Sequence, residues 1–540
     1  MKKLFLIILI VGLNLITGSA QTIPAGANVL DESLRDLQLQ GKIDPTLSMN
    51  ARPYFFSNQL RSDSFFHLID SNFNYNSTIY TNQKNTWVEW LPINTTIEYN
   101  SHHPYGWNHS GMLDAKGFQT MVSGGIFANW GILSVQLMPT AQYAQNPNFE
   151  ITNGFGAATK GAYHKLALGQ SSIRLNYGGI SVGLSNENMW WGPGIQNSLF
   201  MSNNAPGFQH LTINSTKPLK TPIGNFEFQL IAGKLVEDTS VLLEVKDLTT
   251  FYYAQGVYDG LPSVASRDTG DWRYLNALTI SYNPKWIPGL FLGFTRLGYT
   301  YNGFIGEHQN FIKDYLPVLS GFFRSNSQAY SITGANNHTK QLISVSARYV
   351  FSKDHAEIYG EYGSNDNTLN MRDFIMSPNH GSIYTAGFKK MFQLHNKKWI
   401  DIAAEITQLS QPVDYIIRGT GNTYEYQGSY TNQSRVLGAG FGNGSNMQTY
   451  SVSLKDGFNK NGIVIQRIVH DAIREPNVSE NKQWIDLSLG YMFQKRINNF
   501  VFHAQAQMVH SNYYGWSENE KWNLYCYGGL MYLINHKPRN

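Results

Sequence analysis

Apolar and polar residues alternate with a period of two along most of the chain beyond about residue 84. The alternation is clear in four segments: 172–177, 226–230, 485–493 and 500–508. In each of them one face is apolar and the other is polar or charged. Such a period predicts strands with one face on hydrocarbon or a core and the other on water or a polar lumen.

Turn signals separate these runs, among them Asn283-Pro284, Ser377-Pro378-Asn379, Gly442-Asn443-Gly444 and Asn498-Asn499. No long helical pattern lies between them, which argues against a parallel α/β sheet. No repeat of 20–50 residues is visible, which argues against a propeller. The length that remains allows about 16–20 strands with alternating short turns and longer loops. The final run, Leu524 to Leu533, is strand-like, so we expect the last strand to end upstream of residues 536–540.

The first 83 residues have different patterns. Lys2 and Lys3 precede a nearly unbroken apolar run from Leu4 to Ile16, and small residues follow at 18–20. This layout predicts a signal peptide over residues 1–20, cleaved before Gln21.

A short helical region is expected over residues 21–83. Leu30, Leu34 and Leu37 lie at helical spacing, and Gly41 suits the end of that helix. The region is too small for a core of its own, so we expect it to pack on the remainder.

Composition narrows the fold further. Aromatic residues make up 14% of the chain and charged residues 14%, with 49 glycines and a mean hydropathy of −0.31. No apolar stretch of the mature chain is long enough for a spanning helix. Many aromatics with few charges are typical of barrels with aromatic girdles, although a secreted β-sandwich has a similar composition. We therefore predict an all-β fold: a large antiparallel outer-membrane β-barrel over residues 84–540, with a short N-terminal helical region on the periplasmic side.

Charge and cysteine content exclude some classes. The formal net charge of +4 includes two signal-peptide lysines, so the mature chain has no basic footprint for nucleic acid. Cys526 is the one cysteine, which excludes an intramolecular disulfide. Metalloprotease, serine-hydrolase and P-loop motifs are absent from the sequence. We expect no enzyme activity, no cofactor and no metal site.

The most unusual local sequence is Trp190-Trp191-Gly-Pro-Gly194, followed by Ser202-Asn-Asn-Ala-Pro206. It resembles the hallmark of the Wzi-type capsule assembly proteins, in particular their Bacteroidetes-like members. Three further stretches resemble that family in the same order along the chain: Asp44-Pro45 with Arg52-Pro53-Tyr54, residues 356–367 with Arg372-Asp373, and residues 430–442.

The resemblance implies a monomeric barrel in outer-membrane lipid that holds capsular or extracellular polysaccharide at the cell surface in a lectin-like way. A channel for small polar solutes is the alternative, because a polar lumen alone does not separate the two. A glycan-active enzyme on a barrel is the least favoured reading.

Two sets of residues are candidates for function. Trp190, Trp191, Glu187 and Arg174 are candidates for polysaccharide binding, since flat indole faces pair well with sugar rings. The competing interpretation is that the tryptophans pack inside the barrel while Gly192-Pro193-Gly194 makes a sharp bend. The second set is a candidate ion-pair network inside the lumen, formed by Arg348, Glu357, Glu361 and Arg467.

The loop from Ser101 to His109 concentrates three histidines. Without an acid in the pattern this is a weak indication of metal binding, and we expect an exposed or interface loop. Ser364-Asn-Asp-Asn367 lacks the ligand spacing of a calcium loop.

Overall fold

The computed structural model describes residues 21–25, 28–55, 62–82, 86–147, 161–236, 238, 272–306, 311–320, 340–364, 382–395, 398–410, 430–433, 435–442, 444–470 and 482–535. The predicted signal peptide and the predicted turn at 377–379 lie outside these residues.

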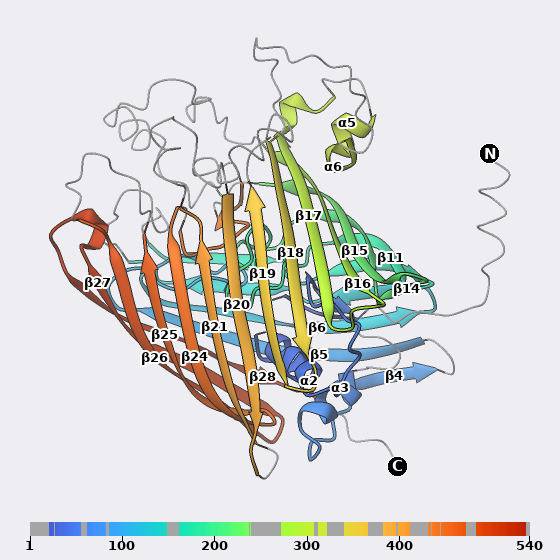
Figure 1. Ribbon diagram of the computed structural model, residues 1–540, viewed down its shortest axis with the longest axis horizontal. Helices are drawn as coiled ribbons and strands as arrows, with labels where there is room; N and C mark the ends of the chain where they lie inside the picture. Colours follow the sequence, from blue (N-terminus) through green and yellow to red (C-terminus); the bar gives the residue numbers. More distant parts are fainter. Residues whose placement is uncertain are drawn as a thin grey trace.

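One large antiparallel sheet dominates the fold (Figure 1). Its segments are β4 (Thr78–Asn82), β5 (Thr86–Asn100), β6 (Gly117–Trp130), β7 (Leu133–Leu137), β8 (Thr140–Ala144), β9 (Tyr163–Ala167), β10 (Ser172–Tyr177), β11 (Ile180–Ser185), β13 (His210–Ser215), β14 (Leu219–Thr221), β15 (Gly224–Leu235), β16 (Arg273–Pro284), β17 (Leu290–Tyr301), β18 (Lys340–Phe351), β19 (Ala356–Ser364), β20 (Ser382–Gln393), β21 (Trp399–Gln408), β24 (Asn446–Asp456), β25 (Asn459–Val469), β26 (Ile485–Ile497), β27 (Phe500–Asn512) and β28 (Lys521–Tyr532).

The sheet closes into a barrel because β28 pairs with β5, from Tyr525 opposite Asn100 to Tyr532 opposite Ile93. The segments β7 and β8 are halves of one interrupted strand, as are β9 and β10, and β13 and β14, while β4 extends the wall beside β5. The barrel therefore has 18 strands, within the predicted range. The last strand ends at Tyr532, as the sequence predicts.

The two ends of the barrel differ in the length of their connections. At one end the turns are short: Gly178 and Gly179, with φ of 61° and 96°, link β10 to β11 in a two-residue hairpin that positive φ angles favour. At the other end the connections are long, such as 101–116, 186–209 and 513–520. We call these the short-turn end and the long-loop end.

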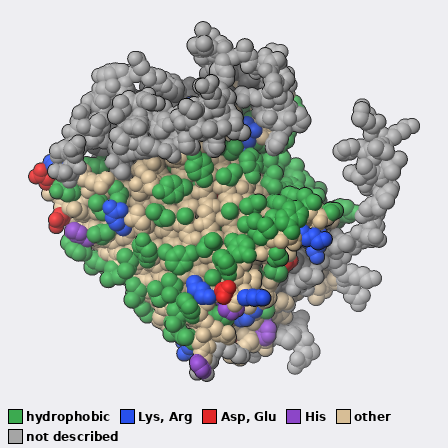
Figure 2. Space-filling model, in the orientation of Figure 1, with side chains coloured by type: hydrophobic (Ala, Val, Ile, Leu, Met, Phe, Trp, Pro, Cys, Tyr) green, Lys and Arg blue, Asp and Glu red, His purple; other side chains and the backbone are tan. Residues whose placement is uncertain are grey.

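The outer face of the barrel is apolar. On β10, Ile173 and Leu175 are 55% and 54% exposed, whereas Arg174 between them is 1% exposed. Figure 2 shows apolar side chains spread over the outer face, with charged ones toward its edges. A water-soluble barrel would place these apolar residues inside, so the outward face is a surface for membrane hydrocarbon.

The predicted N-terminal helical region is present at the short-turn end. It contains α2 (Asn28–Leu39) and α3 (Ser62–Ile69). Leu30, Leu34 and Leu37 of α2 are buried in a cluster with Phe458 and Met531 of the barrel. None of the helices that the structure describes is long and apolar enough to cross a membrane. Two short helices, α5 (Phe311–Tyr315) and α6 (Pro317–Ser320), lie at the long-loop end.

The lumen of the barrel contains an apolar core. Loop residues such as Leu199, Phe200 and Met201 are buried there, in one cluster with inward-facing residues of nine strands. Those wall residues are Ile231, Leu235, Leu275, Ala277, Leu297, Tyr299, Leu342, Ile383, Met447, Ile468, Val509 and Tyr525. Three small two-stranded sheets complete the fold: β1 (Thr22–Ile23) with β3 (Tyr54–Phe55), β2 (Ala51–Arg52) with β12 (Trp190–Trp191), and β22 (Thr431–Asn432) with β23 (Arg435–Val436).

Candidate functional site

The two tryptophans of the hallmark motif lie inside the barrel. The loop between β11 and β13 folds into the lumen, and its short strand β12 pairs with β2, so that Trp190 lies opposite Arg52. Trp190 is 5% exposed and Trp191 1% exposed. The Arg52 guanidinium lies 5.0 Å from the Trp190 ring centroid, and the Trp191 indole N–H donates to Gln229 Oε1 at 2.9 Å. Both rings thus have protein partners, and their contact with polysaccharide stays a prediction.

A sharp bend follows the tryptophans. Gly192 has a φ of 122°, and a Cβ there would clash with the Glu361 carboxylate. After Gly194, the three successive backbone N–H groups of Ile195, Gln196 and Asn197 donate to the Glu405 carboxylate at 2.7–3.0 Å. The loop is therefore anchored to the inner wall by a side chain of β21.

Glu187 and Arg174, the other two predicted polysaccharide residues, bind each other. Arg174 Nη2 lies 2.6 Å from Glu187 Oε2, and both side chains are nearly fully buried. Ser185 and Thr22 also donate hydroxyl hydrogen bonds to Glu187. Burial raises the pKa of the Glu187 carboxyl, but Arg174 and these hydroxyls outweigh it and hold the pKa below its usual value. The pair ties the start of the loop to β10.

The residues predicted to form a lumen network are only partly brought together. Arg348 donates to Glu357, Nε to Oε2 at 2.7 Å, inside the lumen. Glu361 lies on the same wall but accepts a hydrogen bond from Ser344 at 2.7 Å. Arg467 is not part of this network. Its Nη1 donates a hydrogen bond to Gln448 Oε1 at 3.1 Å, and its side chain lies on the outward face of β25 with Ile465.

A second set of charges fixes α2 at the short-turn end. Asp36 lies 2.6 Å from both Lys389 and Lys455, and Glu32 lies 2.6 Å from Lys455. Oxygens of Glu32, Asp36 and Asp401 approach within 4.8 Å of one another, as metal ligands do. The two lysines bind these same carboxylates, so the cluster is a set of ion pairs between the helix and the wall.

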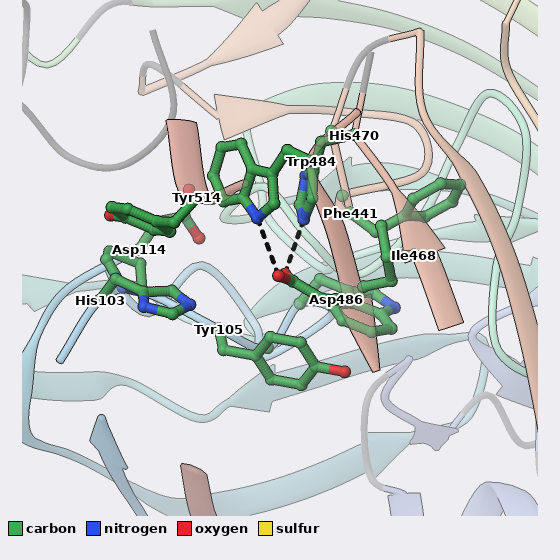
Figure 3. A pocket seen from close by; sticks show the side chains of 14 residues that line it. His103, Tyr105, Asp114, Phe441, Ile468, His470, Trp484, Asp486 and Tyr514 are labelled. Atoms are coloured by element: carbon green, nitrogen blue, oxygen red, sulfur yellow. Dashed lines mark hydrogen bonds and ion pairs between the residues drawn. The ribbon is translucent and has the colours of Figure 1, made fainter. Parts of the chain in front are cut away.

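A pocket lies at the long-loop end, where four separate connections meet (Figure 3). Including its open mouth, it encloses about 590 Å³. The cavity below the mouth is small, about 80 Å³. Its lining is His103, Pro104, Tyr105, Gly106, Trp107, Asp114, Gly440, Phe441, Gly442, Ile468, His470, Trp484, Asp486 and Tyr514.

One wall of the pocket is built around Asp486. Its carboxylate accepts hydrogen bonds from the Trp484 indole N–H at 2.8 Å and from His470 Nε2 at 2.7 Å (Figure 3). The Trp484 and His470 rings are stacked with centroids 4.0 Å apart, and Tyr514 meets Trp484 edge to face. These contacts fix the orientation of an indole at the pocket wall.

The opposite wall is the histidine-rich loop. Tyr105 is buried, and its hydroxyl donates to Gln466 at 3.0 Å. Trp107 is half-buried and packs edge to face on Tyr105 and Phe441. Burial raises the pKa of the Asp114 carboxyl to about 6, against the opposing attraction of Arg435.

The sequence does not predict this pocket. The loop from Ser101 to His109 is expected to be exposed or at an interface, whereas His103 is 1% exposed and hydrogen-bonded to Ser511. His109 is also engaged, because its Nδ1 contacts a carboxylate oxygen of Glu98. The one available signal was the run of aromatic residues between the histidines, Tyr105 and Trp107, on a glycine- and proline-containing loop.

Comparisons with known proteins agree with this architecture. The family described as capsule assembly protein Wzi matches residues 94–498. Among solved structures, the chain is similar to Wzi of Escherichia coli, described as an outer-membrane protein involved in group 1 capsule assembly and a carbohydrate-binding β-barrel. The identity is 12%, the TM-score is 0.58, and the match covers 96% of this chain and 100% of that one.

Two further solved structures come from Acinetobacter baumannii. OccAB3 is 8% identical with a TM-score of 0.40, covering 82% of this chain and 99% of that one. OccAB1 is 9% identical with a TM-score of 0.35, covering 83% and 96%. No curated protein matches the chain. The family match spans well over half of the sequence, so the chain belongs to the Wzi family of capsule assembly proteins.

Proposed function

We propose that this protein is a carbohydrate-binding β-barrel of the outer membrane that takes part in capsule assembly, and that it holds capsular polysaccharide at the cell surface without catalysing a reaction. Family membership supports the capsule role. The E. coli Wzi protein is described as carbohydrate-binding, and we extend that property to this chain.

The pocket at the long-loop end is the observation that carries the proposal. Sugar-binding sites combine aromatic rings with carboxylates. A ring covers the C–H face of a sugar, and a carboxylate accepts hydrogen bonds from its hydroxyl groups. The half-buried Trp107 provides a flat surface, and Asp114 provides an acceptor.

The filled lumen favours a binding role over the alternative of a solute channel. The cluster around Phe200 reaches inward-facing residues of nine strands, including Leu275 and Val509. At the short-turn end α2 is held to the wall by ion pairs of Arg35 and Asp36. A channel needs a continuous polar path, and these two layers of described residues lie across the barrel axis.

Orientation and assembly are part of the proposal. We place the long-loop end outside the cell and α2 and α3 in the periplasm, because outer-membrane barrels have short periplasmic turns and long external loops. We retain residues 1–20 as a signal peptide, 21–83 as a periplasmic helical region and 84–540 as the barrel, and expect a monomer.

Binding of purified capsular polysaccharide to the protein in detergent micelles tests the proposal. We expect Trp107→Ala to weaken binding about tenfold or more, as loss of a stacking ring does in aromatic sites. Trp286→Ala is the matched control, because Trp286 is 65% exposed in the short turn between β16 and β17. Equal binding by wild type and Trp107→Ala, or no binding by either, would contradict the proposal.

A further inference from the structure

The carboxylates of two side chains give the pocket lining its negative charge. Asp114 and Asp486 contribute two carboxylates, and none of the described lining residues is a lysine or an arginine. His470 is bound to Asp486 at 2.7 Å, so its positive charge, when protonated, is balanced locally. Burial lowers the pKa of His103 to about 4, so this histidine is neutral at physiological pH.

Two groups in the lining have hydrogen-bonding capacity to spare. Within the described part of the chain, the Asp114 carboxylate accepts no hydrogen bond, although Arg435 attracts it electrostatically. The Trp107 indole N–H has no hydrogen-bond acceptor among those residues either, and its ring contacts are with Tyr105 and Phe441. An acceptor and a donor are thus present on one loop, at the half-buried Trp107 ring.

We propose that this pocket selects a neutral sugar residue of the polysaccharide over a hexuronic acid residue. The inference rests on the proposed function and adds the class of sugar to it.

The chemistry of the lining explains the selection. A neutral pyranose contacts the half-buried Trp107 ring with its C–H face and donates a hydroxyl hydrogen bond to Asp114. A hexuronate brings a third carboxylate beside Asp114 and Asp486, where no lysine or arginine of the described lining is present to pair with it. Like charges in a partly dehydrated site repel each other.

Calorimetric titration with two matched probes tests the proposal: a β-1,4-linked glucose hexasaccharide and the same oligosaccharide oxidised to carboxylate at every C6. We expect the neutral probe to bind about tenfold tighter or more at low salt. The difference should narrow as salt is raised, because screening weakens repulsion between partly exposed charges.

The variant Asp114→Asn tests whether the preference for the neutral probe arises in the pocket. It removes the charge while keeping an acceptor, so we expect the two affinities to converge. Glu520→Gln is the matched control: it removes one charge from a carboxylate at the same end that is outside the pocket lining, and should leave the preference unchanged.

Equal or tighter binding of the oxidised probe overturns the inference, as does an unchanged preference in Asp114→Asn. If neither oligosaccharide binds while purified capsular polysaccharide does, the sugar preference is wrong and the proposed function stands. If capsular polysaccharide also fails to bind, both fail together.

Discussion

Arg35 on α2 and Glu357 on β19 form a buried ion pair, with Nε and Oε1 2.5 Å apart. Arg348 on the neighbouring strand binds the other oxygen of the same carboxylate. Arg35 Nη2 also donates to the Pro193 carbonyl oxygen of the hallmark loop at 2.8 Å. One helix residue therefore connects the barrel wall, the N-terminal segment and the loop that fills the lumen.

Replacing Arg35 should destabilise this arrangement. Arg35→Met removes a buried cation, and we expect a loss of about 3 kcal/mol in the free energy of unfolding, since breaking a buried ion pair commonly costs 3–5 kcal/mol and Glu357 keeps Arg348. Urea unfolding in detergent measures it. Lys482→Met provides the comparison, because its pair with Glu518 is exposed and should contribute about 1 kcal/mol or less. Equal effects of the two variants would contradict the prediction.

The attachment of α2 should also depend on pH. Burial raises the pKa of the Glu32 carboxyl. The ammonium groups of Lys455 and Lys460 lower the same pKa by more, so that it lies well below the usual 4.5. A depressed carboxyl pKa stabilises the folded state above the unfolded value and loses that contribution as pH falls through the folded value. At pH 7 we expect the wild-type protein to have a higher melting temperature than Glu32→Gln. The difference between the two melting temperatures should shrink below about pH 4.5. A difference that stays constant down to pH 3 would exclude this explanation.

Trp191→Phe separates a structural role of the hallmark tryptophans from sugar contact. The substitution leaves the buried Gln229 oxygen without the indole donor, which costs about 1–3 kcal/mol. If Trp191 acts by holding the loop, thermal stability falls while polysaccharide affinity at 20 °C stays within about twofold of wild type. A large loss of affinity in a variant of undiminished stability would instead support direct contact.

Gly192 and Gly41 make a matched pair for the bend. Both have positive φ, 122° and 70°, but a Cβ at Gly41 meets nothing within 4 Å whereas at Gly192 it meets Glu361. Gly41→Ala should therefore report backbone strain alone, about 1 kcal/mol. Gly192→Ala adds a clash with a buried carboxylate and should cost about 3 kcal/mol in all. Thermal melting of the two variants compares them, and equal shifts would show that the bend tolerates a side chain.

The sequence predicts the barrel well because lipid-facing positions keep a strict period of two, as Ile173 and Leu175 do on either side of Arg174. The same period explains the placement of Arg467, which lies one position from the inward Gln466 and therefore faces outward.

The pocket could not be predicted from this alternation. Its lining comes from connections that are far apart in the sequence. His103 contacts Tyr514 only because the barrel closes where β28 pairs with β5. The alternation along one strand carries no information on which loops meet across the barrel. The packing of Trp190 against Arg52 could not be predicted for the same reason, because it joins two two-residue strands, β2 and β12, that are far apart in the sequence.

Asp114 provides a pH test of the pocket itself. Burial raises the pKa of this carboxyl from 3.8 to about 6, so the neutral form is favoured in the folded protein. A raised pKa contributes stability that is fully present below the unfolded value and is lost as pH rises through the folded value. We therefore expect wild-type stability to fall by about 2 kcal/mol between pH 4 and pH 7 from this group, after allowance for its partial exposure to water.

Asp114→Asn cannot ionise and should not show that loss. Comparing the two proteins by urea unfolding at pH 4, 5, 6 and 7 isolates the contribution of Asp114, because the other titrating groups are common to both. The variant should gain stability relative to wild type as pH rises, with most of the gain complete by pH 7. A stability difference that is flat over this range, or that changes in favour of wild type, would show that Asp114 is not held in a dehydrated site.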